Sequence, residues 1–193
     1  MELSQQFDVG HPPAEVWAFF ADVRAVARCL PGAEIVAIDD EGRIEGRMKV
    51  RFGPISAAFA GEGRLGRDDD SLCGTLSGSG MDRQSRSQCK GEVAYSLTET
   101  SAGGTRVALV VDYTLTGSLA QFSRGGLVDD LAGRLTADFA QALEAALAAR
   151  APDTPPATAT PEAPVEALDA GGLLGAVLWA RLKRFFRRIF GGS

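Results

Sequence analysis

The stretch from Arg43 to Leu65, RIEGRMKVRFGPISAAFAGEGRL, alternates apolar and polar residues on both sides of a Gly-Pro pair. This period of two is typical of β-strands, because successive side chains of a strand point to opposite faces. Gly53 and Pro54, between the two runs, are residues that favour a tight turn. The stretch therefore predicts a β-hairpin with one apolar and one solvated face, as in an antiparallel sheet.

Five further strands are predicted on the two sides of this hairpin from the same kind of alternation. They cover residues 2–9, 31–39, 71–82, 91–100 and 104–120. In the last two of these strands, Val93, Tyr95, Val107 and Leu109 fall on the inner, apolar face. Together with the hairpin, the strands predict an antiparallel sheet of about seven strands.

Two regions have helical periodicity instead. Residues 12–30 begin with two prolines, which a first helical turn tolerates, and continue with apolar residues at three-and-four spacing. A break at Asp22 predicts two short helices there. Residues 126–149 predict one long helix, whose apolar stripe at every fourth position must lie on the sheet. The order of elements predicts an α+β fold, in which a curved antiparallel sheet wraps round a long C-terminal helix.

The inward face of the middle strands is short of side chains. The glycines in phase with its apolar residues are Gly46, Gly61, Gly63, Gly74, Gly78 and Gly80. Either the sheet bends sharply at these glycines and the long helix fills the gap, or the face leaves room for a ligand. We favour an apolar cavity, which suits a lipid-like molecule better than a sugar or a nucleotide. The predicted lining residues are Phe52, Phe59, Leu65, Met81, Tyr95, Tyr113, Phe122, Leu127 and Leu131.

No catalytic or metal-binding constellation can be assembled from the sequence. The single histidine, His11, stands before the first predicted helix, where capping or solvent exposure is expected rather than general-base chemistry. The carboxylate run at residues 68–70 falls at a turn and predicts a solvated loop. The cysteines Cys29, Cys73 and Cys89 lack metal-site spacing and are expected to be reduced, although Cys73 and Cys89 could face each other across a hairpin.

Charge and composition divide the chain into three segments. Residues 1–150 form the predicted domain, and their start, MELSQQFDVGHPP, shows no secretory signal, so we expect a cytoplasmic location. Residues 151–172 hold five of the nine prolines and only acidic charge, which is the composition of an extended, disordered linker. Residues 173–193 hold five basic residues and no acidic ones, in a chain whose formal net charge is -5.

The last segment is predicted to be an amphipathic helix that lies on a membrane surface, with basic residues on one arc and apolar residues on the other. Its apolar run is too short to span a bilayer, which needs about 20 residues. Five cations near an anionic leaflet contribute roughly 5 kcal/mol. The same apolar face could instead dock into a groove on a partner protein. Nucleic-acid binding is disfavoured, because the acidic domain carries no basic surface that would extend the basic tail. The predicted membrane-binding residues are Leu178, Trp179, Arg181, Leu182, Lys183, Arg184, Phe185, Phe186, Arg187, Arg188, Ile189 and Phe190.

Several segments closely resemble the family of carbon monoxide dehydrogenase G subunits, a branch of the START-like (SRPBCC, helix-grip, polyketide cyclase-like) superfamily. They are VWAFFADVRAVARCLPGAE, MKVRFGPISAAFAGEGRL, GTLSGSG and VDYTLTGSLAQFSRGGLVDDLAGRLTADFAQAL. The most specific parts are the Leu-Pro-Gly of residues 30–32, the Gly-Pro turn and the run into the last helix. The resemblance covers residues 1 to about 148.

This resemblance implies a helix-grip fold with an apolar cavity and no chemistry of its own. It further implies that the protein is an accessory to a molybdenum hydroxylase of the carbon monoxide dehydrogenase type. Family members are thought to bring that enzyme to the cytoplasmic membrane. A respiratory quinone, menaquinone or ubiquinone, is the implied noncovalent ligand that links carbon monoxide oxidation to electron transport. The alternative is a cyclase- or hydrolase-like enzyme acting on an apolar ring compound, with Tyr95, Tyr113 or Asp82 as the inward polar group.

The tail makes a first prediction about membrane binding. Anionic liposomes should pellet the whole chain but not a chain that ends at Arg150, because only the whole chain carries the basic, apolar segment. Co-sedimentation with vesicles of phosphatidylglycerol and phosphatidylcholine measures the bound fraction. Equal pelleting of the two proteins would contradict the membrane-binding prediction.

Overall fold

The computed structural model describes residues 1–52, 55–123 and 126–150, and residues 1–151 form one compact unit. The predicted linker (151–172) and tail (173–193) lie outside the described residues, and so do all the predicted membrane-binding residues. The side chain of Phe52 is likewise outside the description. The linker and the tail therefore stay predictions.

The described chain contains seven strands, three α-helices and one short 3-10 helix. In chain order they are β1 (Glu2–Val9), α1 (Pro13–Phe20), α2 (Val23–Cys29), β2 (Ala33–Ile38), β3 (Arg43–Phe52), β4 (Ile55–Asp68), β5 (Cys73–Asp82), β6 (Ser87–Glu99), β7 (Thr105–Thr116), η1 (Ser118–Ser123) and α3 (Leu127–Arg150). The predicted order of strand, two helices, six strands and long helix is confirmed. The predicted last strand is too long, because its final residues form η1 instead.

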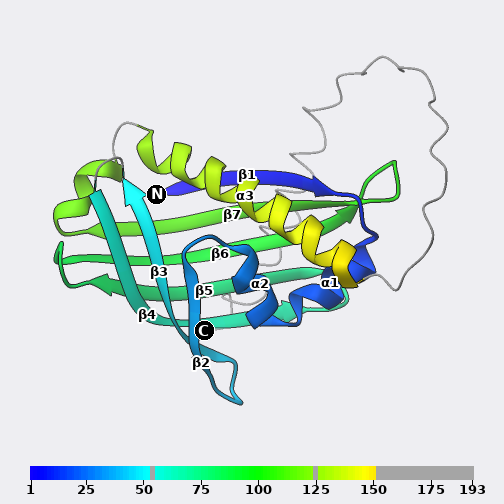
Figure 1. The fold of residues 1–193 in the computed structure, drawn as a ribbon, viewed down its shortest axis with the longest axis horizontal. Helices are drawn as coiled ribbons and strands as arrows, with labels where there is room; N and C mark the ends of the chain where they lie inside the picture. Colours follow the sequence, from blue (N-terminus) through cyan, green and yellow to red (C-terminus); the bar gives the residue numbers. More distant parts are fainter. Residues whose placement is uncertain (53–54, 124–125, 151–193) are drawn as a thin grey trace, which may run out of the picture. The chain divides into compact units, whose positions relative to one another are not determined.

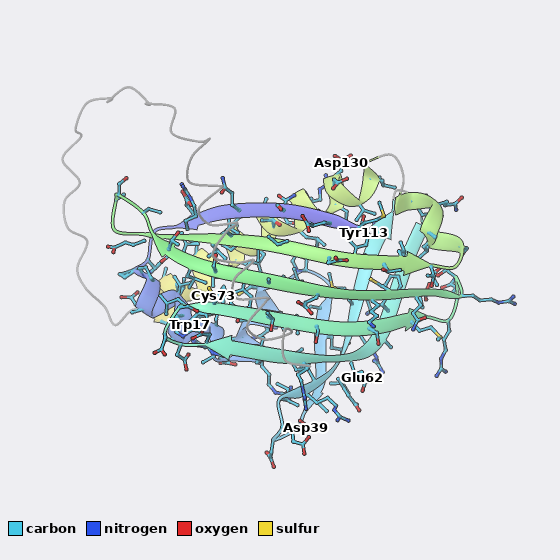
Figure 2. The ribbon with its side chains drawn as sticks, turned by 180° about the vertical axis from the view of Figure 1, so that it is seen from behind. Trp17, Asp39, Glu62, Cys73, Tyr113 and Asp130 are labelled. Atoms are coloured by element: carbon cyan, nitrogen blue, oxygen red, sulfur yellow. The ribbon has the colours of Figure 1, made fainter. Side chains whose placement is uncertain are left out.

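All seven strands form one antiparallel sheet in the order β1-β7-β6-β5-β4-β3-β2. Consecutive strands are neighbours from β2 to β7, and β1 joins the far edge by pairing with β7, with Glu2 opposite Asp112. Figure 1 shows the curved sheet with α1 and α2 at one end and α3 running alongside β1. We call the face that carries the helices the helix-side face; Figure 2 views the sheet from the opposite, outer face.

The two short helices are separated where the sequence predicts a break. Helix α1 has proline in its first turn, and Asp22 caps α2 by accepting a hydrogen bond from the main-chain N–H of Ala25 at 2.9 Å. The Arg150 guanidinium donates to the other carboxylate oxygen of Asp22 at 3.0 Å. The end of α3 is therefore tied to the start of α2.

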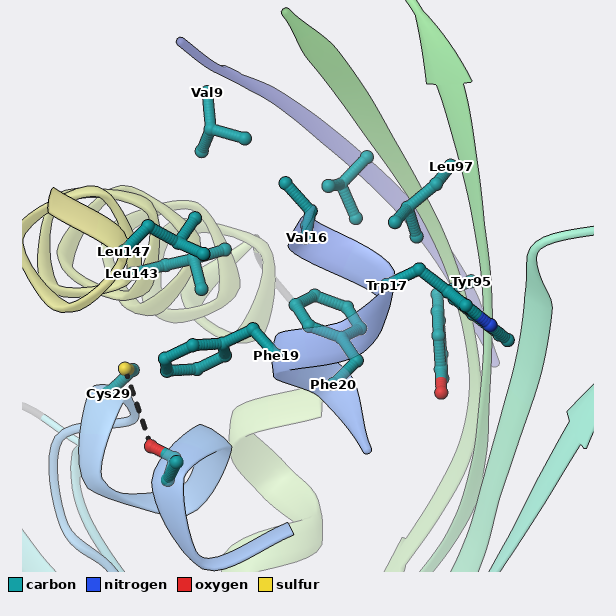
Figure 3. Close-up of a cluster of buried hydrophobic side chains, with 12 residues drawn as sticks. Val9, Val16, Trp17, Phe19, Phe20, Cys29, Tyr95, Leu97, Leu143 and Leu147 are labelled. Atoms are coloured by element: carbon teal, nitrogen blue, oxygen red, sulfur yellow. Dashed lines mark hydrogen bonds between the residues drawn. The ribbon is translucent and has the colours of Figure 1, made fainter. Parts of the chain in front are cut away.

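One hydrophobic cluster closes the end of the sheet beside α1 and α2 (Figure 3). It joins helix residues to strand residues: Val16, Trp17, Phe19, Phe20, Ala25, Cys29, Leu143 and Leu147 meet Val9, Tyr95, Leu97 and Val107. Only the last two turns of α3 contribute buried residues to this cluster, since Leu143 and Leu147 are buried whereas Leu127, Leu131 and Leu135 are half-buried. We call it the first cluster.

A smaller second cluster occupies the opposite end of the sheet, beside η1. Its buried residues are Ala57 and Leu119, and partly buried neighbours are Val50, Phe59, Leu115, Phe122, Leu127, Val128 and Leu131. Helix α3 thus spans from the second cluster at its start to the first cluster at its end. Along this path α3 lies mainly against β1 and α2.

Candidate functional site

Six glycines form two adjacent rows across the middle strands, between the two clusters. In the first row Gly46, Gly61 and Gly80 stand opposite one another on β3, β4 and β5. In the second row Gly63, Gly78 and Gly91 do so on β4, β5 and β6. Residues directly opposite each other in an antiparallel pair share a face, and this face is the one that carries Tyr95. We call these six residues the glycine strip.

Close approach between neighbouring strands requires glycine along this strip. A Cβ atom built at Gly61 would overlap the carbonyl oxygen of Ser79. Built at Gly46, Gly63 or Gly78, it would lie 2.9, 2.9 and 2.8 Å from a main-chain oxygen of the next strand. The glycines therefore permit the curvature of the sheet, which is one of the two interpretations that the sequence left open.

The same glycines leave the helix-side face bare between the clusters. At all six positions, the three atoms nearest to a built Cβ belong to neighbouring strands, and none belongs to α3. The row beside the strip carries Leu65, Leu76 and Val93, and Leu76 is 40% exposed although it lies on this face. An exposed leucine beside bare backbone marks uncovered apolar surface, so this part of the helix-side face is the candidate ligand site.

Most of the predicted lining residues lie on this side of the sheet. Phe59, Phe122, Leu127 and Leu131 pack in the second cluster, and Leu65 packs against the first. Met81 was assigned to the wrong face: it pairs with Ala60 and Gln88, on the outer face, and is 52% exposed. Strand alternation explains the difference, because Met81 directly follows Gly80, which faces the helices.

Tyr95 lies on the predicted face but is part of the packed core. Its ring stands 5.5 Å from that of Phe20 and 6.2 Å from that of Trp17, between ring centroids. A Cβ at Gly74 would overlap the phenol, so the side chain of Tyr95 fills the space that the sequence left empty at Gly74. Burial raises the pKa of the Tyr95 hydroxyl. Tyr95 is thus a structural contact between α1 and the sheet.

Asp82, another inward polar candidate, closes the turn between β5 and β6. It is buried and accepts hydrogen bonds from the Ser85 hydroxyl at 2.5 Å and from the Ser85 main-chain N–H at 3.1 Å. The hydroxyl of Ser85, together with main-chain N–H donors, holds the pKa of Asp82 below its usual value despite burial. A carboxylate held ionised by a turn is poorly suited to general acid–base catalysis at neutral pH.

Tyr113 is a polar residue at the end of the second row of the glycine strip. It stands opposite Gly91 at the end of the second row and is half-buried on the helix-side face. Burial raises the pKa of its hydroxyl, with smaller contributions in the same direction from Asp129 on α3 and from Cys89. Cys89 follows Gly80 in the first row, and burial raises the pKa of its thiol. Both groups therefore stay protonated and neutral at physiological pH.

Three features of the site escaped sequence reasoning. Gly91 was placed at the start of a predicted strand, whereas β6 begins at Ser87, so Gly91 lies within the strand and extends the strip. The exposure of Leu76 and the position of Cys89 depend on packing that no local pattern reports. The signal for Gly91 was available, because it continues the alternation that Val93 and Tyr95 define.

The remaining candidates have structural roles or none. Nδ1 of His11 lies 3.2 Å from Glu15, and the main-chain oxygen of His11 accepts a hydrogen bond from Thr105 at 2.6 Å. Cys73 pairs with Ser96 rather than facing Cys89. No disulfide joins the cysteines in the described part of the chain, and the described residues contain no cluster of three or more potential metal ligands.

Asp69, in the predicted solvated loop, instead contributes to the end of the sheet near α1. It accepts a hydrogen bond from Nε1 of Trp17 at 2.7 Å and from the Arg67 guanidinium at 3.3 Å. The same guanidinium lies over the Trp17 ring, 3.9 Å from its centroid. These contacts hold α1 against the turn between β4 and β5 and so fix one end of the candidate site.

Comparisons with known proteins agree with this architecture. The family model for the G subunit of carbon monoxide dehydrogenase (CoxG) matches residues 6–148. A conserved protein from Geobacillus kaustophilus has a similar structure, with a TM-score of 0.66 and 14% identity over 77% of this chain and 96% of that one. Comparison with curated protein sequences finds no match.

Two further solved structures share the fold at low identity. A START superfamily protein from Mycobacterium smegmatis has a TM-score of 0.51 and 17% identity over 77% of this chain and 97% of that one. An aromatase/cyclase from a Streptomyces species has a TM-score of 0.54 and 15% identity over 78% and 94%. The predicted START-like helix-grip fold is confirmed.

The glycine strip makes a prediction about stability. Gly61→Ala should lower the free energy of unfolding by about 1 to 3 kcal/mol, because its Cβ would overlap Ser79. Gly133→Ala, the matched control, places the same methyl group in open space on α3 and should raise stability by up to about 1 kcal/mol. Urea unfolding of both variants measures the difference. Similar effects of the two substitutions would show that the strip does not need glycine.

Proposed function

Because the chain belongs to the family of carbon monoxide dehydrogenase G subunits (CoxG), we propose that it is a non-catalytic accessory protein. The enzyme that it serves is, in this proposal, a molybdenum hydroxylase of the carbon monoxide dehydrogenase type. In this proposal it recruits the hydroxylase to the cytoplasmic membrane and carries a hydrophobic ligand, a respiratory quinone, on its helix-side face. The quinone, menaquinone or ubiquinone, couples carbon monoxide oxidation to electron transport. The bare apolar surface beside the glycine strip is the observation that carries the ligand-binding part.

The chemistry of the helix-side face supports a carrier of an apolar ligand. Leu65, Leu76 and Val93 border the strip with apolar surface, and the 40% exposure of Leu76 leaves that surface free to be covered. Covering apolar area contributes roughly 25 cal/mol per Å², so a hydrophobic ligand is favoured there without any charged contact. A sugar or a nucleotide would leave most of its polar groups without partners on such a surface.

The polar residues of the site favour a carrier over an enzyme. A cyclase-like activity needs an acid or base beside the ligand, yet Asp82 is held by the turn and Tyr95 is packed between Trp17 and Phe20. The similarity to an aromatase/cyclase, at 15% identity, concerns the fold alone. Tyr113 is the one inward candidate among these three that stays available. Turnover of a ring substrate that Tyr113→Phe abolishes would favour the enzyme.

Membrane recruitment rests on the sequence of residues 151–193. None of the helices in the described part of the chain is long and apolar enough to cross a membrane. We assign attachment to the basic, apolar tail, which would lie on the inner leaflet through its phenylalanines and arginines. The predicted extended linker of 22 residues (151–172) would reach up to roughly 70 Å at about 3.1 Å per residue. This span would let the domain meet a membrane-bound quinone and the hydroxylase in turn.

The ligand-binding part predicts that the purified protein retains an extractable quinone. Leu76→Arg should lose it, because a charged side chain at an exposed position of the helix-side face makes that surface unsuitable for an apolar ligand. Met81→Arg, on the outer face of the same strand, should retain it. Native mass spectrometry and analysis of an organic extract measure the bound molecule. An empty native protein, or equal retention by both variants, would contradict the proposal.

A further inference from the structure

The centre of the glycine strip is a square of four glycines on two adjacent strands. Gly61 stands opposite Gly80, and Gly63 stands opposite Gly78. Gly46 extends the first row onto β3, and Gly91 extends the second row onto β6. With about 4.8 Å between strands and about 7 Å between alternate residues, each row of three glycines is roughly 10 Å long, and the two rows lie roughly 7 Å apart, offset by one strand. Ile44, opposite Gly63 on β3, and Cys89, opposite Gly80 on β6, occupy the positions where a row has no glycine. The helix-side face is without a Cβ atom over the central square and along these two offset rows.

Such a surface favours a planar ring over a flexible chain. Dispersion contacts are individually weak and add up only when many atoms approach to within about 4 Å. A flat ring system can place its whole face against bare peptide groups, whereas an alkyl chain is accommodated equally well by ordinary apolar side chains. Apolar residues border the strip on both sides: Leu65, Leu76 and Val93 toward the first cluster, Phe59 and Leu115 toward the second.

Tyr113 supplies a hydrogen-bond donor at the edge of this surface. It follows Gly91 in the second row, and its hydroxyl makes no hydrogen bond within the part of the chain that the structure describes. Its neighbour at the end of the first row, Cys89, is a weak donor. The other tyrosine, Tyr95, has its phenol over Gly74, packed against α1 and away from the strip.

We propose that the glycine strip and Tyr113 form a seat for a planar ring that carries a carbonyl group, with the Tyr113 hydroxyl donating a hydrogen bond to that carbonyl oxygen. This inference rests on the proposed binding of an apolar ligand and adds where its ring would lie and which residue would bind its carbonyl oxygen. An apolar chain attached to the ring would leave the strip past Leu76, whose exposed surface it would cover. The seat selects ring-bearing ligands over simple lipids, because only a flat ring uses the bare backbone.

Duroquinone binding to the whole chain tests this seat by isothermal titration calorimetry. All four substitutable ring positions of duroquinone carry methyl groups, so the Cys89 thiol has no open ring carbon to attack. Tyr113→Phe removes only the hydroxyl and should weaken binding about two- to tenfold, the effect of one net hydrogen bond. Tyr95→Phe, the matched control, should leave the affinity unchanged, because the phenol of Tyr95 faces α1.

A second readout separates a ligand contact from a structural effect. The infrared carbonyl band of bound duroquinone should lie at lower frequency than in an apolar solvent, because a donated hydrogen bond weakens the C=O bond. This shift should disappear in Tyr113→Phe and persist in Tyr95→Phe. Loss of stability alone would not move the carbonyl band of the quinone that remains bound.

Farnesol, an isoprenoid alcohol without a ring, distinguishes the seat from the broader function. Tighter binding of duroquinone than of farnesol, together with a selective effect of Tyr113→Phe, supports the seat. Binding of farnesol without duroquinone, or duroquinone binding that Tyr113→Phe leaves unchanged, overturns the seat but keeps the proposed carrier function. Binding of neither molecule contradicts the carrier function itself.

Discussion

The close approach of the middle strands is the constraint on which the rest of this structure depends. Along the glycine strip, main-chain oxygens of one strand lie where the neighbouring strand would carry a Cβ, as at Gly61 beside Ser79. Only glycine allows this approach, so the sheet can curve there. Curvature brings the two ends of the sheet toward α3, and it is at these ends that the first and second clusters form.

The glycines that allow this curvature carry no side chains, so the sheet has a bare surface where a hydrophobic core would normally be. Protein interiors pack at about 0.75 density, with few voids larger than a water molecule. Here the packing is concentrated at the ends, where Leu143 and Leu119 are fully buried, while Leu76 between them is 40% exposed. The same residues thus bend the sheet and leave an uncovered surface, and we propose that this surface binds the ligand. A carrier needs such a preformed apolar surface but no acid, base or metal of its own.

Strand and helix positions could be predicted because their periodicity is local. The hairpin alternation around Ile44 and Val50 indicated the correct face, and the break at Asp22 matches a side-chain cap that links α1 and α2. Residue-level placement failed where strands end or where distant elements meet. Met81 lies one residue from a correctly placed glycine but on the other face, and the packing of Tyr95 depends on Trp17 from a helix 78 residues earlier in the chain. No local pattern contains such a contact.

A crystal structure of the whole chain with duroquinone tests the central claim most directly. The account predicts a ring lying flat over the backbone of Gly61, Gly63, Gly78 and Gly80, with one carbonyl oxygen within hydrogen-bond distance of the Tyr113 hydroxyl. Side chains of α3 filling the space above these glycines, with the quinone absent or bound on the outer face, would contradict it.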